Sequence, residues 1–199
     1  MFLINLFLTI VLFFSPALEE FTWEKRLEKD DIIIYTRHVK ESNFKEFLAE
    51  ATMKGSIDEF EDIFTDIENY PSWMPDCKSV EIVDIPTPSN ITYHMKLKVP
   101  FPFANRDIIQ QLILNRKDDI LEIDIINQPT KIKENKKYVR MQQAKGKWLI
   151  KEISSEEISI KFQYFANPGG DIPAWLVNSF IVKNPHITLL NIKEMLANQ

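Results

Sequence analysis

Two pairs of ionisable residues have a spacing that could support acid and base chemistry. Glu122 and Asp124 would share one face of a strand, because strand side chains alternate with a period of two residues. The apolar residues between and beside them would occupy the buried face, so both carboxylates should lie in solvent. Arg106 and Asp107 are adjacent and should leave a strand on opposite faces. We therefore expect the Arg-Asp pair to cap or latch a loop, and we predict no catalytic residue.

The histidines and the cysteine indicate neither a metal site nor a nucleophile. His38, His94 and His186 are far apart in the sequence and belong to no motif with metal-ligand spacing. Cys77 is the only cysteine, so no disulfide can form within the chain, and its apolar neighbours favour a small buried residue. The sequence contains no phosphate-binding glycine motif and no G-x-S-x-G motif. We predict a protein without metal or cofactor.

Composition and charge favour one globular domain. The 199 residues are 45% hydrophobic and 27% charged, without repeats or low-complexity tracts, and one core can hold a chain of this length. The net charge of -5 is spread along the chain, which argues against a nucleic acid partner. We expect a monomer.

The first residues are typical of a secretory signal peptide. An apolar run from Phe2 to Phe14 is followed by Ser15-Pro16-Ala17, which supplies the small residues of a cleavage site. We predict a signal peptide over residues 1–17, a mature domain over 18–199, and export to the periplasm in a bacterium or secretion otherwise. Because no Lys or Arg precedes the run, an uncleaved N-terminal membrane anchor is the alternative.

The elements that must position any site begin with strands. Residues 23–36 are rich in β-branched residues and predict a strand or hairpin, and 44–53 alternate as a half-buried strand. Ser56 and Glu59 form the S-x-x-E capping box that begins a helix, which we expect Pro71 to end.

The remaining pattern predicts a meander followed by a long helix. Turn residues separate strands expected at 78–85, 91–99, 106–115, 119–127, 137–151 and 157–166. The four glycines, including Gly146, should all lie at element ends. Asp171 is the expected N-cap of an amphipathic helix over 174–196, with a kink or short break near Pro185.

Five segments, in order and in register, carry a resemblance to a known family. They are IYTR at 34–37, DIENYPSWM at 66–74, PFPFANRD at 100–107, GKW at 146–148 and PGGDIPAWLVN at 168–178. From about Trp23 onward the chain resembles the bacterial form of the StAR-related lipid-transfer (START) family, in the helix-grip superfamily. The resemblance implies an α+β fold in which a curved antiparallel sheet wraps around a long C-terminal helix and encloses a hydrophobic cavity. It also implies a lipid ligand, a sterol, phospholipid or fatty acid.

Strand alternation then predicts which residues line that cavity. Cholesterol-binding members of the family bury an acidic and a basic side chain in the cavity. The aligned positions here are Met95 and Leu112, so the resemblance does not imply sterol recognition by such a charged pair. The predicted lining residues are Tyr93, Met95, Leu97, Ile108, Gln110, Leu112, Leu114, Phe162, Tyr164, Trp175 and Phe180. Tyr93, Gln110 and Tyr164 are the expected polar groups. The alternative is that these residues fill a solid core.

The cavity mouth is predicted from two loops. Trp73, Met74, Phe101 and Phe103 should flank it and touch membrane or ligand, or else plug the core. The function that follows is non-catalytic binding of a lipid for transport or sensing, with transient membrane contact. The alternatives are a polyketide cyclase or aromatase of the same superfamily and a lipid-gated interaction module. A polar, charge-lined cavity would favour the enzyme, and an apolar cavity would favour transport.

Overall fold

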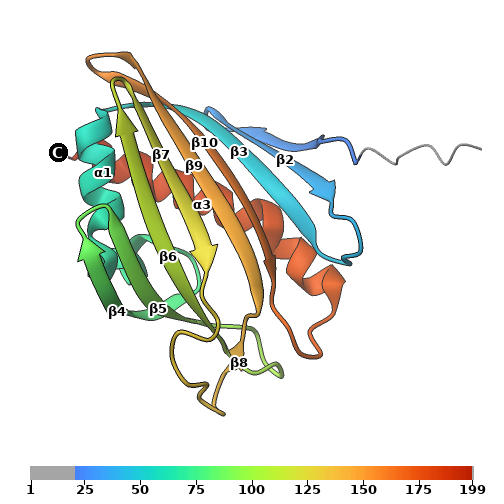
Figure 1. Cartoon of the computed structure of the whole chain (residues 1–199). Helices are drawn as coiled ribbons and strands as arrows, with labels where there is room; N and C mark the ends of the chain where they lie inside the picture. The colour runs from blue at the N-terminus through green and yellow to red at the C-terminus, as the bar shows by residue number, and fades with distance from the viewer. Residues whose placement is uncertain (1–20, 199) are drawn as a thin grey trace, which may run out of the picture.

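A computed structural model describes residues 21–198 and shows a large sheet curving around a long helix (Figure 1). Within those residues the sheet has 10 strands in the order β1-β2-β3-β10-β9-β7-β6-β5-β4, with β8 beside β6. The strands are β1 (Glu24–Lys29), β2 (Ile32–His38), β3 (Lys45–Lys54), β4 (Cys77–Thr87), β5 (Asn90–Leu97), β6 (Arg106–Lys117), β7 (Ile120–Asn127), β8 (Val139–Arg140), β9 (Gln143–Ser154) and β10 (Glu157–Asn167). This confirms the predicted helix-grip architecture. The predicted signal peptide lies outside the described residues.

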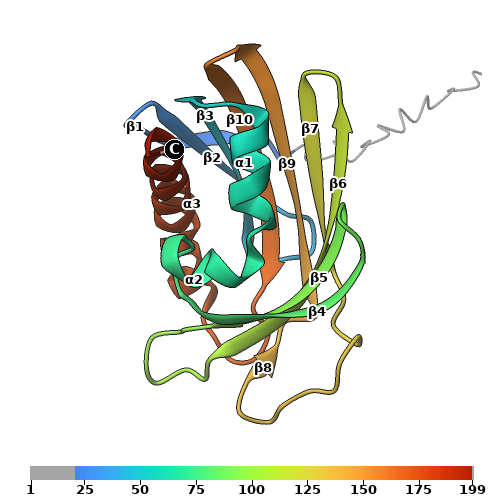
Figure 2. The same cartoon turned by 90° about the vertical axis from the view of Figure 1, so that its left-hand side faces the viewer.

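The chain segment that connects β3 to β4 forms two short helices and a 3-10 turn, which cross the concave side of the sheet (Figure 2). They are α1 (Ile57–Thr65), the turn η1 (Ile67–Asn69) and α2 (Tyr70–Trp73). The predicted capping box is present, because Glu59 N donates to Ser56 Oγ and Ser56 N donates to Glu59 Oε2. The expected end at Pro71 is wrong: α1 ends at Thr65, and Pro71 lies in the first turn of α2, where its missing N–H costs nothing.

The long helix α3 (Ala174–Ala197) packs against β2 and β3. Its N-cap is Pro173, not Asp171, which is exposed in the preceding turn. Of the kink or short break expected near Pro185, the break is absent, since the helix is continuous through that residue. Pro185 is buried, and its ring occupies space between helix and sheet.

Two predictions for the meander need correction. The strand expected over 137–151 is two strands, because β8 pairs in parallel with β6 and β9 pairs with β7 and β10. Gly146 is inside β9 and not at an element end. A Cβ atom there would lie 2.5 Å from Tyr164 Cδ2, so the glycine allows the Tyr164 ring to lie directly on the β9 backbone. Gly55, Gly169 and Gly170 do lie at element ends and have positive φ.

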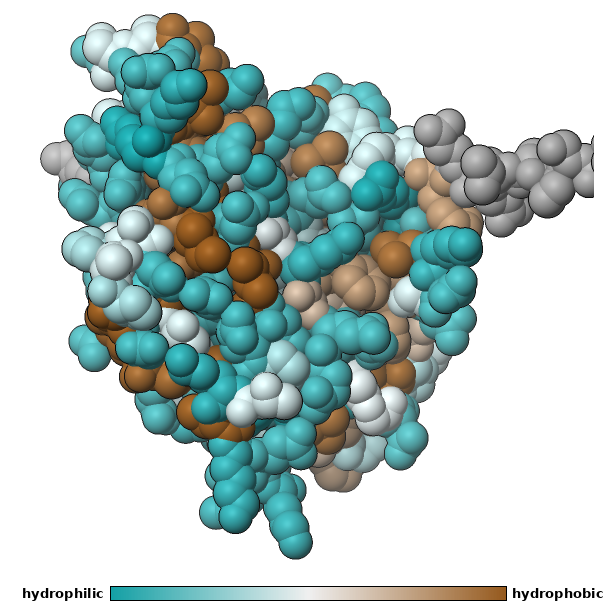
Figure 3. All heavy atoms as spheres, viewed as in Figure 1, coloured by the Kyte–Doolittle hydropathy of each residue, from teal (hydrophilic) through white to brown (hydrophobic). Residues whose placement is uncertain are grey.

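The core fills the concave side. Phe60 and Phe64 of α1 contact Trp148 of β9, and Leu189 and Ile192 of α3 are fully buried. Cys77 is buried, as predicted. The convex face is mainly hydrophilic, with apolar residues exposed among the polar ones (Figure 3).

In residues 21–198 no helix is long and apolar enough to cross a membrane. The same part of the chain contains no group of three or more His, Cys, Asp or Glu side chains that could hold a metal ion.

Candidate functional site

An apolar cavity of about 160 Å³, here called the inner pocket, lies between the sheet and α3. The sheet supplies most of its wall, and Asn184, Pro185 and Thr188 of α3 close it. The lining residues are Phe47, Phe64, Met74, Pro75, Tyr93, Met95, Leu97, Gln110, Ile125, Trp148, Phe162, Tyr164, Asn184, Pro185 and Thr188. None of these side chains carries a charge at neutral pH.

A stack of aromatic rings forms one wall of the inner pocket. The rings of Trp148 and Phe162, on neighbouring strands, are parallel with centroids 3.8 Å apart. Phe47 meets the Phe162 ring edge-on at 4.9 Å. Phe64 of α1 packs against Trp148 from the other side at 5.1 Å. Because the rings hold one another in place, this wall is preformed.

Two hydrogen bonds, here called the polar relay, connect three side chains of the inner pocket: Tyr93 of β5, Gln110 of β6 and Tyr164 of β10. Tyr93 Oη donates to Gln110 Oε1 over 2.8 Å, and Gln110 Nε2 donates to Tyr164 Oη over 2.8 Å. Burial raises the pKa of Tyr164 to about 12, and burial raises the pKa of Tyr93 well above its usual value. Both hydroxyls therefore stay protonated at neutral pH and serve as hydrogen-bonding groups without charge.

A second cavity of about 230 Å³, here called the outer pocket, adjoins the first. The two pockets share Pro75, Leu97, Tyr164 and Asn184. The other residues of the outer pocket are Asp76, Lys98, Val99, Pro100, Arg106, Met141, Ala166, Pro168, Ile172, Val177 and Phe180. Charged side chains thus occur only at this outer end of the described cavity.

Arg106 fixes the loop that leads into α3. Its guanidinium is buried and donates to the carbonyl oxygens of Ala104, Pro168 and Gly169. Burial lowers the pKa of Arg106, and the charge of Asp171 partly offsets this effect. The loop latch expected for Arg106 is confirmed.

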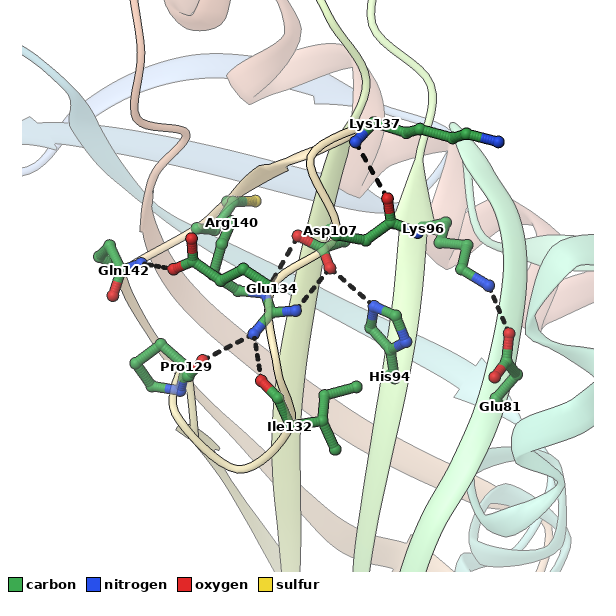
Figure 4. A network of polar contacts seen from close by, with 12 residues as sticks. Glu81, His94, Lys96, Asp107, Pro129, Ile132, Glu134, Lys137, Arg140 and Gln142 are labelled. Carbon is green, nitrogen blue, oxygen red and sulfur yellow. Dashed lines mark hydrogen bonds and ion pairs between the residues drawn. The ribbon is translucent and has the colours of Figure 1, made fainter.

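Asp107 points to the opposite, convex face of the sheet, where it forms a buried ionic network (Figure 4). Arg140 Nη2 lies 2.7 Å and His94 Nε2 lies 2.8 Å from Asp107 Oδ2. Arg140 also donates to the carbonyl oxygens of Pro129 and Ile132, which ties down the loop between β7 and β8. Burial alone would raise the pKa of Asp107, but the contacts with Arg140 and His94 hold it below its usual value. The network lies across the sheet from the cavity and is structural.

Comparisons with known proteins agree with this architecture. The START domain model matches residues 11–192. The chain belongs to the START family. A solved StAR-related lipid transfer protein from Xanthomonas axonopodis (fragment 25–204) is 27% identical, with a TM-score of 0.81 over 88% of this chain and 98% of that one.

Curated relatives include a lipid carrier. Mouse phosphatidylcholine transfer protein is 27% identical over 171 residues, which cover 82% of this START chain and 78% of the mouse protein. An uncharacterised Pseudomonas aeruginosa protein is 25% identical over 172 residues, covering 86% of this chain and 85% of its own length.

Most predicted lining residues do face the cavity of this START domain. Those in the inner pocket are Tyr93, Met95, Leu97, Gln110, Phe162 and Tyr164, and Phe180 lines the outer pocket. Period-two alternation placed the six strand residues on the concave face, whereas Phe180 belongs to α3.

Four predicted lining residues lie elsewhere. Ile108, Leu112 and Leu114 are on the concave face but are buried in the solid core, away from both pockets. Trp175 is 71% exposed, so the expectation that it faces the sheet is wrong. Trp175 lies on the outward side of the first turn of α3, whereas Val177 and Phe180 of the same helix line the outer pocket.

The four residues predicted at the mouth have different environments. Met74 lines the inner pocket, whereas Trp73 is buried in the core beside Phe64 and Tyr70. Phe101 is 96% exposed, and Phe103 is half-buried in the same loop. Trp73 therefore fits the alternative of a core plug.

Sequence reasoning missed lining residues from α1, β7, β9 and α3. Phe64, Ile125 and Trp148 each belong to a recognisable buried face, but no local signal shows that this face borders a cavity. Asn184 and Thr188 are spaced by one helical turn, which places them on one side of α3 and could have indicated them.

Proposed function

We propose that this START protein binds one lipid in the joined pockets and transports or senses it, without catalysing a reaction. The observation that supports this most directly is the lining of the inner pocket, which is apolar except for uncharged hydroxyl and amide groups. Binding there would be driven by burial of apolar surface, at about 25 cal/mol per Å². Shape and a few hydrogen bonds would then fix the ligand's orientation.

The size of the cavity constrains the ligand. The inner pocket has about 160 Å³ and the outer pocket about 230 Å³. Each is smaller than the roughly 300 to 1,000 Å³ of ordinary small-molecule sites. We infer that a ligand occupies both pockets, with its apolar part inside and its polar part beside Asp76 and Lys98. A single-chain lipid fits this space better than a diacyl lipid, for which α3 would have to move.

A cyclase or aromatase would need groups that exchange protons at neutral pH. The titratable side chains lining the inner pocket are Tyr93 and Tyr164, whose raised pKa values keep them protonated. General acid and base catalysis works best when the pKa is near the working pH. This favours binding over catalysis.

Membrane contact would occur around the outer pocket. Phe101 is 96% exposed and follows Pro100, which lines that pocket, and Trp175 is 71% exposed beside the lining segment of α3. Aromatic side chains at an aqueous surface partition favourably into the lipid interface. We propose that these residues touch the membrane during ligand exchange, and that the protein acts after export.

The proposal is tested by native mass spectrometry of the protein purified from its own host, followed by transfer of a fluorescent lipid between vesicles. We expect one lipid per chain and measurable transfer. Met95→Lys should abolish both, because it puts an unpaired charge into the inner pocket. The matched control Ile153→Lys, at an exposed position on β9, should behave as the wild type. A folded wild type that binds and transfers no lipid of any class would contradict the proposal.

A further inference from the structure

The polar relay in the inner pocket leaves one tyrosine hydroxyl proton without an acceptor in the described part of the chain, in addition to the second amide proton of Gln110. Tyr93 uses its hydroxyl proton on Gln110, and Gln110 uses an amide proton on the Tyr164 oxygen. Each tyrosine hydroxyl has a single proton. The Tyr164 proton has no acceptor among the side chains and backbone of residues 21–198. If the Gln110 amide oxygen and nitrogen were exchanged, Tyr164 would donate to Gln110 and Tyr93 would accept from it. One tyrosine O–H therefore remains available in either orientation.

The surroundings of this O–H select what it can bind. No charged side chain lines the inner pocket, so a phosphate or carboxylate there would be buried without a counter-charge. A ligand hydroxyl would bring its own proton, and two partners would then be needed, one to donate and one to accept. A carbonyl oxygen needs only a donor, and the Tyr164 hydroxyl supplies one. Thr188 of α3 adds a second hydroxyl to the inner pocket, and a carbonyl oxygen, which has two lone pairs, can accept from either hydroxyl.

We propose that Tyr164 determines specificity by donating a hydrogen bond to the ester carbonyl of an acyl lipid. This inference rests on the proposed lipid-binding function. Tyr164 lines both pockets, and its hydroxyl is beside Gln110 in the inner pocket. A carbonyl held there would direct the acyl chain into the inner pocket and the headgroup toward Asp76 and Lys98 in the outer pocket. In a glycerolipid with an ester-linked acyl chain, the ester carbonyl lies at this boundary between chain and headgroup.

The test compares two lipids that differ in this carbonyl. Palmitoyl lysophosphatidylcholine has an ester, and its hexadecyl ether analogue has the same headgroup and chain length without the carbonyl. Binding of each is measured by isothermal titration below its micelle concentration. The wild type should bind the ester at least about tenfold more tightly, because the ether leaves a buried donor unsatisfied. Tyr164→Phe should bind the two lipids with equal affinity. The change from the wild type should come mainly from a lower affinity for the ester, because only the ester loses a hydrogen bond.

Phe47→Leu is the matched control, since Phe47 lines the same pocket and offers no hydrogen bond. This variant should lower the affinity for both lipids by the same factor and keep the preference for the ester. Because the preference is a ratio within one protein, partial loss of folded variant does not change it.

The outcomes separate the two proposals. Equal binding of both lipids by the wild type, or an ester preference that survives Tyr164→Phe or is lost in Phe47→Leu, would overturn the specificity inference and leave lipid binding intact. Failure of the wild type to bind either lipid would count against the proposed function, and the inference would fail with it.

Discussion

The ring of Tyr164 on β10 lies against the backbone of Gly146 on β9, where a Cβ atom would be 2.5 Å from Tyr164 Cδ2. The two residues are directly paired across the strands. Tyr164 lines both pockets, and its hydroxyl accepts a hydrogen bond from Gln110. A residue without a side chain thus sets the position of a residue that lines the cavity.

Gly146→Ala should displace the Tyr164 ring and weaken lipid binding. Overpacking of this kind typically costs about 1 to 3 kcal/mol, so the melting temperature should also fall. In the double variant Gly146→Ala/Tyr164→Leu the cost of the alanine should largely disappear, because the branched aliphatic side chain can turn away. Additive effects of the two substitutions on urea unfolding would show that they do not contact.

Asp107→Asn should destabilise the protein in a pH-dependent way. The pKa of Asp107 is lowered in the folded state, so its stabilising contribution is present above the unfolded value of about 3.9 and is lost as the pH falls through the folded value. At pH 7 the asparagine leaves Arg140 buried without a counter-charge, at a cost of about 3 to 5 kcal/mol. Urea unfolding between pH 7 and pH 3 should show the difference from wild type shrinking below about pH 4.

Glu81→Gln is the control for that experiment. Glu81 pairs with Lys96 on the convex face, but its side chain is 61% exposed, so solvent screens the pair. Its loss should cost less than about 1 kcal/mol at pH 7. Similar losses for both variants, or a cost for Asp107→Asn that does not depend on pH, would refute the assignment.

Phe101→Ala and Trp175→Ala should slow lipid transfer between phosphatidylcholine vesicles several-fold. Both side chains are exposed, so the free energy of unfolding should change by less than about 0.5 kcal/mol. Ile153→Ala, which removes an exposed apolar side chain elsewhere on the sheet, should transfer lipid at the wild-type rate. If all three variants match the wild type, the membrane contact is elsewhere.

The signal peptide prediction is checked by N-terminal sequencing of the protein from its host. We expect the mature chain to begin at Leu18 or within two residues of it. Recovery of an intact chain starting at Met1 in a membrane fraction would support the anchored alternative, and the same chain in the cytoplasm would exclude export.

Sequence patterns predicted the concave face well because a period of two residues is a local property. Tyr93, Met95 and Leu97 alternate along β5, and all three line the inner pocket. The capping box at Ser56 was equally local and is present. The family resemblance, and not periodicity, supplied the expectation of a cavity.

The failures involve relations between distant segments. Leu112 and Met95 have the same alternation, yet only Met95 borders a pocket, because α1, α2 and α3 determine which part of the concave face is filled. Gly146 was placed at a strand end because its partner Tyr164, 18 residues later, was unknown. Trp175 was expected to face inward because the sequence does not show which side of the first turn of α3 packs against the rest of the domain.

The position of α3 in chain order has a consequence for biosynthesis. Helix α3 follows every strand, and its residues Leu189 and Ile192 complete the burial of β2 and β3. Until residues 174–197 leave the ribosome, a nascent chain exposes the apolar concave face of β2 and β3. Such surfaces promote aggregation and recruit chaperones. Translation that stalls before Ala174 should therefore yield a chain that depends on chaperones for solubility, although all of its strands have been synthesised.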